Sequence, residues 1–374
     1  MKRYVLDART ATAHFPGIGR YVSQLARHLA PLLAAEEQLL LFHPPEAGWP
    51  LPEADKNVMR VATAVSPFSL AQQWQIPHLL RQMKATVYHS AYYLMPYRPG
   101  VPTLLTLYDL IPEQFPQLVS LRARLFTRLA TWLSLRAGSH FLAISEATRQ
   151  LFLASRKIDY AKISVVPLAA DDRFEPQPET AVATLRQKLN LPERFVLYLG
   201  SNKPHKNLAR LIAAWKVATQ TRQDAPPLII AGAWDARYGD VKTAVAEQNL
   251  THQIKFIGRI DDADLPALYS GATLFVFPSL VEGFGLPVLE AMACGTAVAC
   301  GNASSLPEVG GDAVAYFDPT NIQQMAAVLQ KLAQNEEQLA ELAQKGLVQA
   351  AKFSWEKTAA STLTQYRKLA QNPL

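Results

Sequence analysis

Short apolar segments that alternate with amphipathic segments constrain the fold of this chain more than any other feature. They lie at residues 2–8, 38–42, 86–89, 103–107 and 140–144, and again at 195–199, 228–231, 254–257, 273–277 and 297–299. Each is of strand length, and apolar residues at helical spacing follow most of them. Such alternation predicts parallel sheets that carry helices on both faces.

A polar, proline-bearing stretch at residues 170–179 separates the two runs of alternating segments. A length of 374 residues is comfortable for two domains. We therefore expect an α/β protein with two doubly wound, Rossmann-like domains, 1–170 and 171–352. The end of the chain, from Thr320 to Leu369, is expected to be helical throughout, with Ser354 as an N-cap.

Composition and charge limit the classes of function. The chain is 49% hydrophobic and 18% charged, which is ordinary for a cytosolic globular protein. Asp7 and Arg9 interrupt the apolar start, so no signal peptide is expected, and no apolar run predicts a membrane span. We expect a cytoplasmic protein whose membrane contact is limited to the inner face of the plasma membrane. The net charge of +6 suits anionic substrates or an anionic membrane better than nucleic acid.

The cysteines and histidines give no sign of a metal site. Cys294 closes a helical segment and Cys300 ends a strand segment, so we do not expect them to pair. Neither these residues nor the eight histidines show a metal-ligand spacing, and no metal or cofactor is expected.

Segments that follow strands are the first place to look for a site. Ligands of parallel sheets bind beyond the carboxyl ends of the strands, so these segments share one edge. In the second half they are residues 203–206, 232–235, 258–260 and 282–286, and in the first half they are 17–20 and 108–109. The sequence therefore predicts a ligand site in a cleft between the two domains.

The segment from Glu282 to Glu290 carries the strongest chemical signal. Pro287 suits the first turn of a helix, whose free N–H groups attract an anion such as a diphosphate. Gly283 and Gly285 let backbone approach a ligand closely. The two glutamates would accept hydrogen bonds from hydroxyl groups. A diphosphate between two polyols is a nucleotide-sugar, and the alternative is a capped surface helix with a solvated Glu290.

The turn from Gly200 to Asn207 brings basic side chains to the start of another helix. Lys206 would stabilise the negative charge that develops on a diphosphate as its bond to a sugar breaks. A solvated cluster of basic side chains is the alternative.

A loop from Thr10 to Gly19 leads to a helix that we expect to begin near Arg20. Its glycines indicate close approach of the backbone to a ligand, and a simple tight turn is the alternative. Val22 stands where a dinucleotide fingerprint has its third glycine, and His43 follows the second strand where an acid is needed. Binding of NAD is therefore disfavoured.

The spacing of Glu282 and Glu290, with Gly-Phe-Gly-Leu-Pro between them, resembles the signature of the family 4 retaining glycosyltransferases. Similar elements run from Gly17 to Trp355. The resemblance implies the GT-B fold, in which two Rossmann-like domains face each other across a deep cleft. It also implies that segment 353–374 crosses back onto the first domain.

The resemblance further implies roles for individual residues. Glu282, Lys206 and Asp109 are the implied catalytic residues, and Glu290 is the implied ligand of the ribose hydroxyls. The donor site is implied at Gly17, Gly19, Ser201, Lys203, Lys206, Gly258, Arg259, Ile260, Glu282, Gly283, Phe284, Gly285, Leu286 and Glu290. The acceptor side is implied at Arg20, Tyr108 and Asp109.

Some positions depart from the family pattern. Ser201 and His205 stand where many members carry an arginine, so one expected cation is missing or neutral, and Lys203 is left open as its substitute. Tyr108 replaces a histidine, and a tyrosine pKa of about 10 makes it a poor proton shuttle. Asp109 is left as either an acceptor contact or a helix cap. A same-face substitution assisted by the leaving phosphate is therefore our mechanistic hypothesis.

We therefore expect a retaining, metal-independent glycosyltransferase of cell-surface polysaccharide or glycolipid synthesis. The stretch from Lys203 to Asn207 resembles a subgroup of mannosyl- and rhamnosyltransferases. It favours transfer of mannose from GDP-mannose to a saccharide or lipid-linked saccharide. A UDP- or dTDP-sugar donor stays open, as do a sugar-nucleotide epimerase, a phosphorylase and a non-catalytic sugar-nucleotide-binding scaffold.

The segment from Ser120 to Arg136 carries four arginines among Leu, Phe and Trp, with no acidic residue. A basic amphipathic helix of this kind can lie on an anionic bilayer. We favour instead a buried helix whose arginines reach solvent at its rim.

Overall fold

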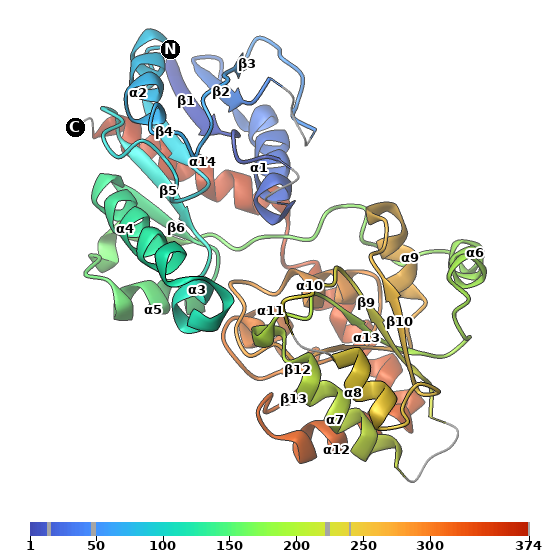
Figure 1. The fold of residues 1–374 in the computed structure, drawn as a ribbon. Helices are drawn as coiled ribbons and strands as arrows, with labels where there is room; N and C mark the ends of the chain where they lie inside the picture. Colours follow the sequence, from blue (N-terminus) through green and yellow to red (C-terminus); the bar gives the residue numbers. More distant parts are fainter. Residues whose placement is uncertain (13–15, 46–49, 221–224, 239–240, 373–374) are drawn as a thin grey trace. The chain divides into compact units, whose positions relative to one another are not determined.

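The structure is a computed structural model that describes residues 1–12, 16–45, 50–220, 225–238 and 241–372. The chain divides into two compact units (Figure 1). Unit 1 comprises Met1–Leu168 and Ser354–Leu374, and unit 2 comprises Ala169–Phe353. These limits lie close to the expected boundaries at 170/171 and 352/353, and the last segment is part of unit 1.

Unit 1 contains a seven-stranded parallel sheet in the order β3-β2-β1-β4-β5-β6-β7. The strands are β1 (Lys2–Asp7), β2 (Glu37–His43), β3 (Val58–Ala62), β4 (Val87–Ser90), β5 (Thr103–Leu107), β6 (His140–Ala143) and β7 (Ile163–Val165). The α-helices are α1 (Pro16–Leu29), α2 (Gln72–Gln82), α3 (Ile111–Gln114), α4 (Leu121–Ala137), α5 (Glu146–Ser155) and α14 (Trp355–Gln371). The 3₁₀ turns are η1 (Ala30–Leu32), η2 (Pro116–Leu118) and η3 (Tyr160–Lys162).

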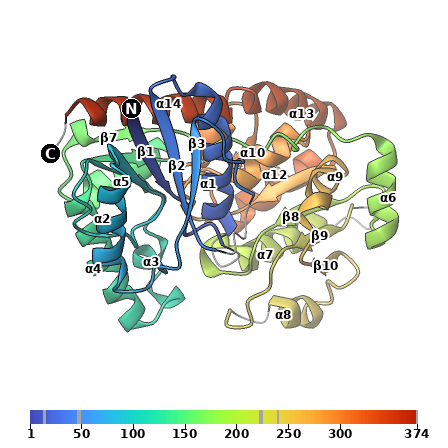
Figure 2. The same cartoon turned by 90° about the horizontal axis from the view of Figure 1, so that it is seen from above.

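Both faces of this sheet are covered. Side chains of α2, α4 and α5 join one apolar core with alternate residues of the strands, such as Tyr88. His89, the next residue along β4, points to the opposite face, where its Nδ1 lies 2.8 Å from the hydroxyl of Tyr366 in α14. Helix α14 lies beside α1 (Figures 1 and 2).

Unit 2 contains a six-stranded parallel sheet in the order β10-β9-β8-β11-β12-β13. The strands are β8 (Val196–Leu199), β9 (Leu228–Ala231), β10 (Ile254–Gly258), β11 (Leu274–Phe277), β12 (Val298–Gly301) and β13 (Ala315–Phe317). The α-helices are α6 (Glu179–Leu189), α7 (Leu208–Thr219), α8 (Val241–Glu247), α9 (Leu265–Ser270), α10 (Leu286–Ala293), α11 (Leu306–Gly310), α12 (Ile322–Ala333) and α13 (Glu336–Ala350). The 3₁₀ turns are η4 (Pro204–Lys206) and η5 (Asp262–Asp264).

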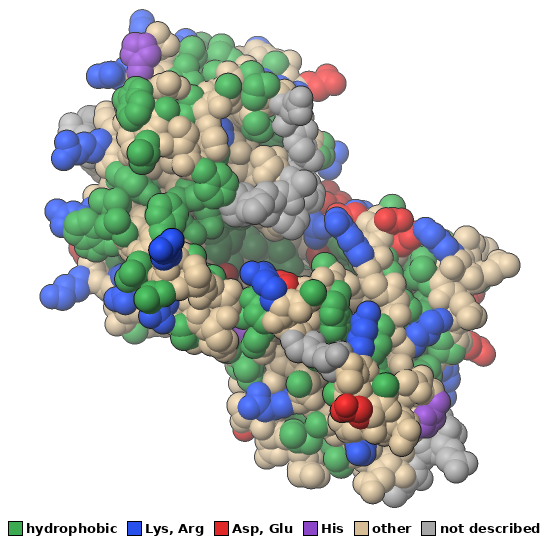
Figure 3. All heavy atoms as spheres, viewed as in Figure 1, with side chains coloured by type: hydrophobic (Ala, Val, Ile, Leu, Met, Phe, Trp, Pro, Cys, Tyr) green, Lys and Arg blue, Asp and Glu red, His purple; other side chains and the backbone are tan. Residues whose placement is uncertain are grey.

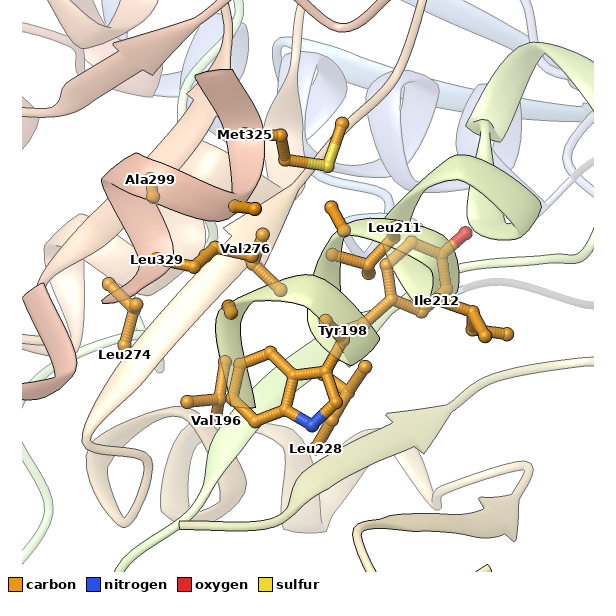
Figure 4. Close-up of a cluster of buried hydrophobic side chains, with 14 of the residues drawn as sticks. Val196, Tyr198, Leu211, Ile212, Leu228, Leu274, Val276, Ala299, Met325 and Leu329 are labelled. Atoms are coloured by element: carbon orange, nitrogen blue, oxygen red, sulfur yellow. The ribbon is translucent and has the colours of Figure 1, made fainter. Parts of the chain in front are cut away.

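The core of unit 2 shows why these segments form strands. Every second residue of β8, β9, β11 and β12 points to one face of the sheet and meets side chains of α7 and α12 (Figure 4). Tyr198 of β8 lies there beside Leu211 and Ile212 of α7 (Figure 4). Residues of the opposite parity, such as Phe275, are buried as well. Burial on both faces is typical of parallel sheets and explains the continuous apolar runs in the sequence.

The first helix begins earlier than expected. Helix α1 starts at Pro16, so Gly17 and Gly19 lie within its first turn and not in a preceding loop. Proline is favoured at the first helical position because its missing N–H has no intrahelical partner there. Residues 13–15 of the predicted loop lie outside the described residues.

The expectation that residues 320–369 are helical throughout is wrong at two short breaks, residues 334–335 and 351–354. Asn335 accepts a hydrogen bond from the N–H of Gln338 at the start of α13, and Ser354 accepts one from Lys357 at the start of α14. The prediction that Ser354 is an N-cap is therefore confirmed, and both residues mark the starts of helices. Cys294 and Cys300 are buried and free, as expected.

The expectation of a buried helix at residues 120–136 is also wrong. Five large apolar side chains of α4 are between 49% and 62% exposed, namely those of Leu121, Leu125, Phe126, Leu129 and Trp132. Leu133 and Leu135 are half-buried, and the buried positions are Ala130, Thr131 and Ser134. Most of the large side chains of this helix therefore face outward. In the part of the chain that the structure describes, no helix combines the length and apolar character of a membrane span.

An ion pair fastens α14 to the sheet of unit 1. Arg367 donates two hydrogen bonds to Glu37 of β2, with N–O distances of 2.8 and 2.7 Å, and the hydroxyl of Tyr4 donates a third at 2.9 Å. The carboxylate of Glu37 is only 3% exposed. The hydrogen bond from Arg367 lowers the pKa of Glu37 to about 2.

This pairing predicts a defined loss of stability in acid. A carboxylate whose pKa falls on folding stabilises the protein above its unfolded pKa, and this contribution disappears as pH falls through the folded pKa. The melting temperature of the wild type should therefore exceed that of Glu37→Gln at neutral pH, and the gap should close between pH 4.5 and about 2. Glu36→Gln, at an exposed neighbour, is the control. A gap that stays constant down to pH 2 would contradict this assignment.

Candidate active site

Two loops of unit 2 leave its sheet where the strand order reverses. Strands β8 and β11 are neighbours, and the chain continues from β8 toward β9 but from β11 toward β12. In open parallel sheets, a switch point of this kind opens a crevice at the carboxyl edge. Residues 200–207 follow β8 and residues 278–285 follow β11. The two strongest sequence signals therefore converge at one point.

Hydrogen bonds fix the two loops against each other. The side-chain amide of Asn207 donates to the carbonyl oxygens of Pro278 at 3.0 Å and Pro319 at 2.6 Å. The N–H of Leu280 donates to the carbonyl oxygen of His205 at 2.8 Å. Asn207 has a positive φ of 62°, a conformation that asparagine adopts more readily than most residues. The sequence analysis missed this role of Asn207. The signal that could have found it is an asparagine directly before a helix.

An ion pair between Lys206 and Glu282 joins the two loops at the switch point. The Nζ atom of Lys206 donates a hydrogen bond of 2.6 Å to Oε1 of Glu282. The two side chains are 18% and 11% exposed, so both are largely withdrawn from water but still reachable. Nζ of Lys206 also lies 5.1 Å from the ring centroid of Phe277. The pair places a cation for an anionic group beside an acceptor for a hydroxyl group.

His205 does not act as a cation in this turn. Its side chain is buried, and burial together with the adjacent charge of Lys206 lowers its pKa to about 4. His205 is therefore neutral at pH 7. A missing or neutral cation in this turn is what the sequence analysis expected. Ser201 contributes its carbonyl oxygen, which accepts a hydrogen bond of 2.7 Å from Tyr198. The basic side chains left in this turn are those of Lys203 and Lys206.

Gly285 sets the direction of the chain as it enters α10. Its φ of 108° belongs to the region that favours glycine, and an added Cβ would lie 2.7 Å from the side chain of Leu306. Helix α10 then begins at Leu286, with Pro287 in its first turn as predicted. First-turn N–H groups have no intrahelical partner and carry the positive end of the helix dipole.

Two serines hold the loop that precedes α10. The N–H of Glu282 donates to the hydroxyl of Ser304 at 2.8 Å. The hydroxyl of Ser305 lies 3.0 Å from the carbonyl oxygen of Glu282 and 2.8 Å from that of Phe284. Phe284 is buried and packs edge-on against Phe353. The sequence analysis missed both serines, although they follow β12 at the same edge of the sheet.

Glu290 lies on the buried side of α10, one helical turn further on. Its side chain is 4% exposed, and Oε2 accepts a hydrogen bond of 3.1 Å from the hydroxyl of Tyr269 in α9. Each carboxylate oxygen can accept more than one hydrogen bond, so the bond from Tyr269 does not by itself use all the acceptor positions of Glu290. The alternative of a solvated Glu290 on a surface helix is therefore wrong.

The loops after β9 and β10 complete the edge next to β8. Gly232 has a φ of 126°, and a Cβ at this position would lie 2.1 Å from the carbonyl oxygen of Gly200. The side-chain amide of Asn202 donates to the carbonyl oxygen of Asp235 at 2.9 Å and accepts from its N–H at 2.8 Å. Gly258, at the end of β10, also has a positive φ. These contacts let backbone approach closely and hold the loop after β9.

A small cavity at this edge is lined by Lys242, which the sequence analysis did not select, and by Trp234 of the predicted segment 232–235. Gly200, Gly232 and Gly258 also line it, and Nζ of Lys242 lies 4.9 Å from the ring centroid of Trp234. Of the predicted donor residues after β10, Arg259 is exposed and Ile260 is buried.

The predicted residues of unit 1 lie at the carboxyl edge of its own sheet. Gly17 is exposed at the first turn of α1, Gly19 is buried, and Arg20 is half-buried. Asp109 accepts a hydrogen bond of 3.0 Å from the N–H of Ile111, the first residue of α3, whose N-cap position is Leu110. The hydroxyl of Tyr108 is buried and finds no hydrogen-bond partner among the described residues.

The structure thus brings together the predicted residues of unit 2, namely Ser201, Lys203, Lys206, Gly258, Arg259, Ile260, the segment 282–286 and Glu290, at one edge of one sheet. The residues predicted in unit 1 belong to a separate edge, and the cleft that would join the two groups stays a prediction. The described residues contain no group of His, Cys, Asp and Glu suited to a metal ion.

Comparison with protein families supports the assignment made from these residues. Residues 182–348 match the model of "Glycosyl transferases group 1", and residues 16–174 match that of "Glycosyltransferase Family 4". The two matches lie almost entirely in unit 2 and unit 1, respectively. The chain therefore belongs to the family 4 glycosyltransferases, which have the GT-B fold.

Individual proteins show the same relationship. The O-antigen chain mannosyltransferase B of Escherichia coli is 29% identical over 94% of this chain and 96% of its own. The serotype-specific mannosyltransferase WbdA of Escherichia coli is 36% identical over 63% of this chain, but only 29% of its own length is matched. Among solved structures, Anabaena HepE in complex with UDP and glucose has a TM-score of 0.74 at 20% identity, covering 98% of this chain and 99% of that one.

The burial of Glu290 generates a prediction for binding. Replacing Glu290 by alanine should weaken binding of a nucleoside diphosphate at least about tenfold, because hydrogen bonds to a buried carboxylate are lost. Calorimetric titration of GDP, UDP and dTDP into wild type and Glu290→Ala measures this. Glu337→Ala, at an exposed position of α13, is the control and should bind as the wild type does. Equal affinity of wild type and Glu290→Ala would remove Glu290 from the site.

Proposed function

We propose that this glycosyltransferase moves a hexose from a nucleotide-sugar to a hydroxyl group of a saccharide or lipid-linked saccharide, with retention of configuration. Mannose from GDP-mannose is the proposed donor, and synthesis of a cell-surface polysaccharide or glycolipid is the proposed setting. The names of the two Escherichia coli relatives support mannosyl transfer. We place the enzyme in the cytoplasm, in peripheral contact with the inner face of the plasma membrane.

The observation that carries the proposal is the pairing of Lys206 with Glu282 beside the start of α10. A diphosphate needs positive charge, which Lys206 and the first-turn N–H groups of the helix supply. A sugar needs hydrogen-bond acceptors for its hydroxyl groups, and Glu282, which is hydrogen-bonded to Lys206, supplies them. The same point of the sheet therefore suits both sides of a sugar–phosphate bond.

Each part of the donor has a proposed partner in unit 2. Glu290 and Tyr269 form a buried polar pair that suits the ribose hydroxyls. The loops that begin at Gly232 and Gly258 suit the base, because Gly232 lies against the backbone of Gly200 and both glycines have a positive φ. The sugar lies against Glu282 and the backbone of Phe284, Gly285 and Leu286. These roles agree with those that the family resemblance implies.

The proposed chemistry needs no base from the protein. As the bond between the anomeric carbon and the phosphate oxygen breaks, negative charge collects on the diphosphate, where Lys206 and the helix dipole stabilise it. The acceptor hydroxyl attacks the anomeric carbon from the same face and passes its proton to the departing phosphate. We propose that protein cations and N–H groups replace a metal ion in this role, and that no cofactor takes part. Arg20, Tyr108 and Asp109 remain the proposed acceptor side.

The proposal is tested with defined donors. GDP-mannose, UDP-glucose and dTDP-rhamnose are each incubated with the protein and a set of mannose-terminated acceptors, and products are identified by NMR. The expected result is transfer from GDP-mannose alone, with an α-linked product from the α-linked donor. A β-linked product would contradict retention, and transfer from another donor would contradict the choice of GDP-mannose.

Lys206→Ala should lower kcat by about 10²–10³-fold, because it removes a fixed charge that acts on the leaving group. Lys216→Ala, at an exposed position of α7, is the matched control. Circular dichroism of both variants checks that the fold is retained. Unchanged turnover of a folded Lys206→Ala variant would contradict the role assigned to this lysine.

A further inference from the structure

The outward face of α4 is a stripe of large apolar side chains. Leu121, Leu125, Leu129 and Trp132 follow one another at helical spacing, and Phe126 lies beside them. Their exposed fractions are 62%, 56%, 56%, 49% and 55% for Leu121, Leu125, Leu129, Trp132 and Phe126. Exposed apolar patches of this kind mark interaction surfaces in soluble proteins.

Much of the apolar surface of α4 faces away from the core of unit 1. Ala130, Thr131 and Ser134 are its buried positions, and Ser134 bonds to the backbone of its own helix. An ordinary helix of a globular protein would bury most of its large apolar residues. The core of unit 1 takes up Leu135 but leaves the five side chains of the stripe exposed, so they are available to another apolar phase.

Positive charge flanks this apolar stripe. Arg122, Arg128 and Arg136 are exposed on α4, Arg124 is half-buried, and the helix contains no acidic residue. The guanidinium of Arg136 lies 4.9 Å from the ring centroid of Trp132. In Figure 3, hydrophobic side chains gather over α4, and Lys and Arg side chains lie around them.

The stripe ends at a basic cavity. A cavity of about 680 Å³ lies between the end of α4 and the end of α5, and Trp132 belongs to both the stripe and the cavity wall. Arg136, Lys157 and Lys162 line the cavity, with Asp159 as the acidic lining residue. Asp159 accepts a hydrogen bond of 3.0 Å from the N–H of Ala161. The cavity therefore carries an excess of positive charge next to an exposed tryptophan.

The same side of the sheet carries a second group of exposed apolar side chains. Phe68, Leu70 and Trp74 are 61%, 79% and 60% exposed at and before the start of α2. Helices α2 and α4 contribute to the same core and so cover the same face of the sheet.

We propose that the outward face of α4 and the adjoining basic cavity dock on an anionic lipid bilayer. Leu125, Phe126, Leu129 and Trp132 enter the boundary between headgroups and acyl chains, as apolar faces of interfacial helices do. The arginines remain at the level of the headgroups, and the cavity takes a headgroup phosphate.

The charge pattern selects a bilayer over a second copy of this chain. A symmetric dimer through α4 would place the same patch of each copy against the other, and arginines would face arginines. An anionic bilayer offers the opposite charge over an extended plane, with an apolar layer directly beneath. The inference rests on the membrane contact named in the proposed function and identifies the surface that makes it. Its failure can be told apart from failure of glycosyl transfer, because binding to a bilayer needs neither donor nor acceptor.

The test measures binding of the full chain to lipid vesicles. Vesicles of phosphatidylcholine with and without phosphatidylglycerol are sedimented with wild type, a stripe variant (Phe126→Ser with Leu129→Ser) and a charge variant (Arg122→Gln with Arg128→Gln). Val348→Ser, at an exposed apolar position of α13, and Lys331→Gln, at an exposed lysine of α12, are the controls. Circular dichroism of each variant checks folding.

The expected result is binding to vesicles that contain phosphatidylglycerol, weakened by salt and reduced about tenfold or more in both α4 variants. The controls should bind as the wild type does, and turnover with a water-soluble acceptor should be equal in all folded variants. Absence of binding, or equal binding by wild type and the stripe variant, would overturn the proposal. A wild-type dimer in sedimentation equilibrium that the stripe variant abolishes would also overturn it.

Discussion

The proposed site depends on one ion pair, Lys206 with Glu282, at the point where the strand order of unit 2 reverses. A carboxylate close to a diphosphate is unfavourable unless it is neutralised. Two unit charges 4 Å apart interact by about 4 kcal/mol at the effective dielectric of a protein surface, which is roughly a thousandfold in affinity. In the proposed function, Lys206 offsets this repulsion, so that Glu282 and an anion can share one site.

The remainder of unit 2 holds this pair in place. Asn207 ties the turn after β8 to the loop after β11, and Ser304 and Ser305 tie that loop to the turn after β12. These bonds join side chains to backbone groups of the neighbouring loops, so contacts within the protein hold the ion pair in place. Preorganised charge of this kind stabilises a transition state without a reorganisation cost during the reaction.

The sequence alone predicted the parts of the fold that rest on continuous apolar runs, such as β11, whose two faces are both buried. It missed β3, β7 and β13 because edge strands are short or half-exposed, and their pattern resembles that of loops. It predicted the Glu282–Glu290 segment because glycine, proline and acid each have a local physical reason there. It did not predict that Lys206 and Glu282 pair, because that contact joins residues far apart in the chain. It favoured burial of α4 because composition alone does not tell which side of a helix faces the protein.

A crystal structure of the protein with the nucleoside diphosphate that it binds most tightly tests the central claim most directly. The account predicts the diphosphate within hydrogen-bond distance of Lys206 Nζ and of the N–H groups at the start of α10. It also predicts the ribose hydroxyls on Glu290 and leaves Glu282 facing the space for the sugar. A diphosphate bound away from the β8–β11 switch point, or a ribose that does not contact Glu290, would contradict it.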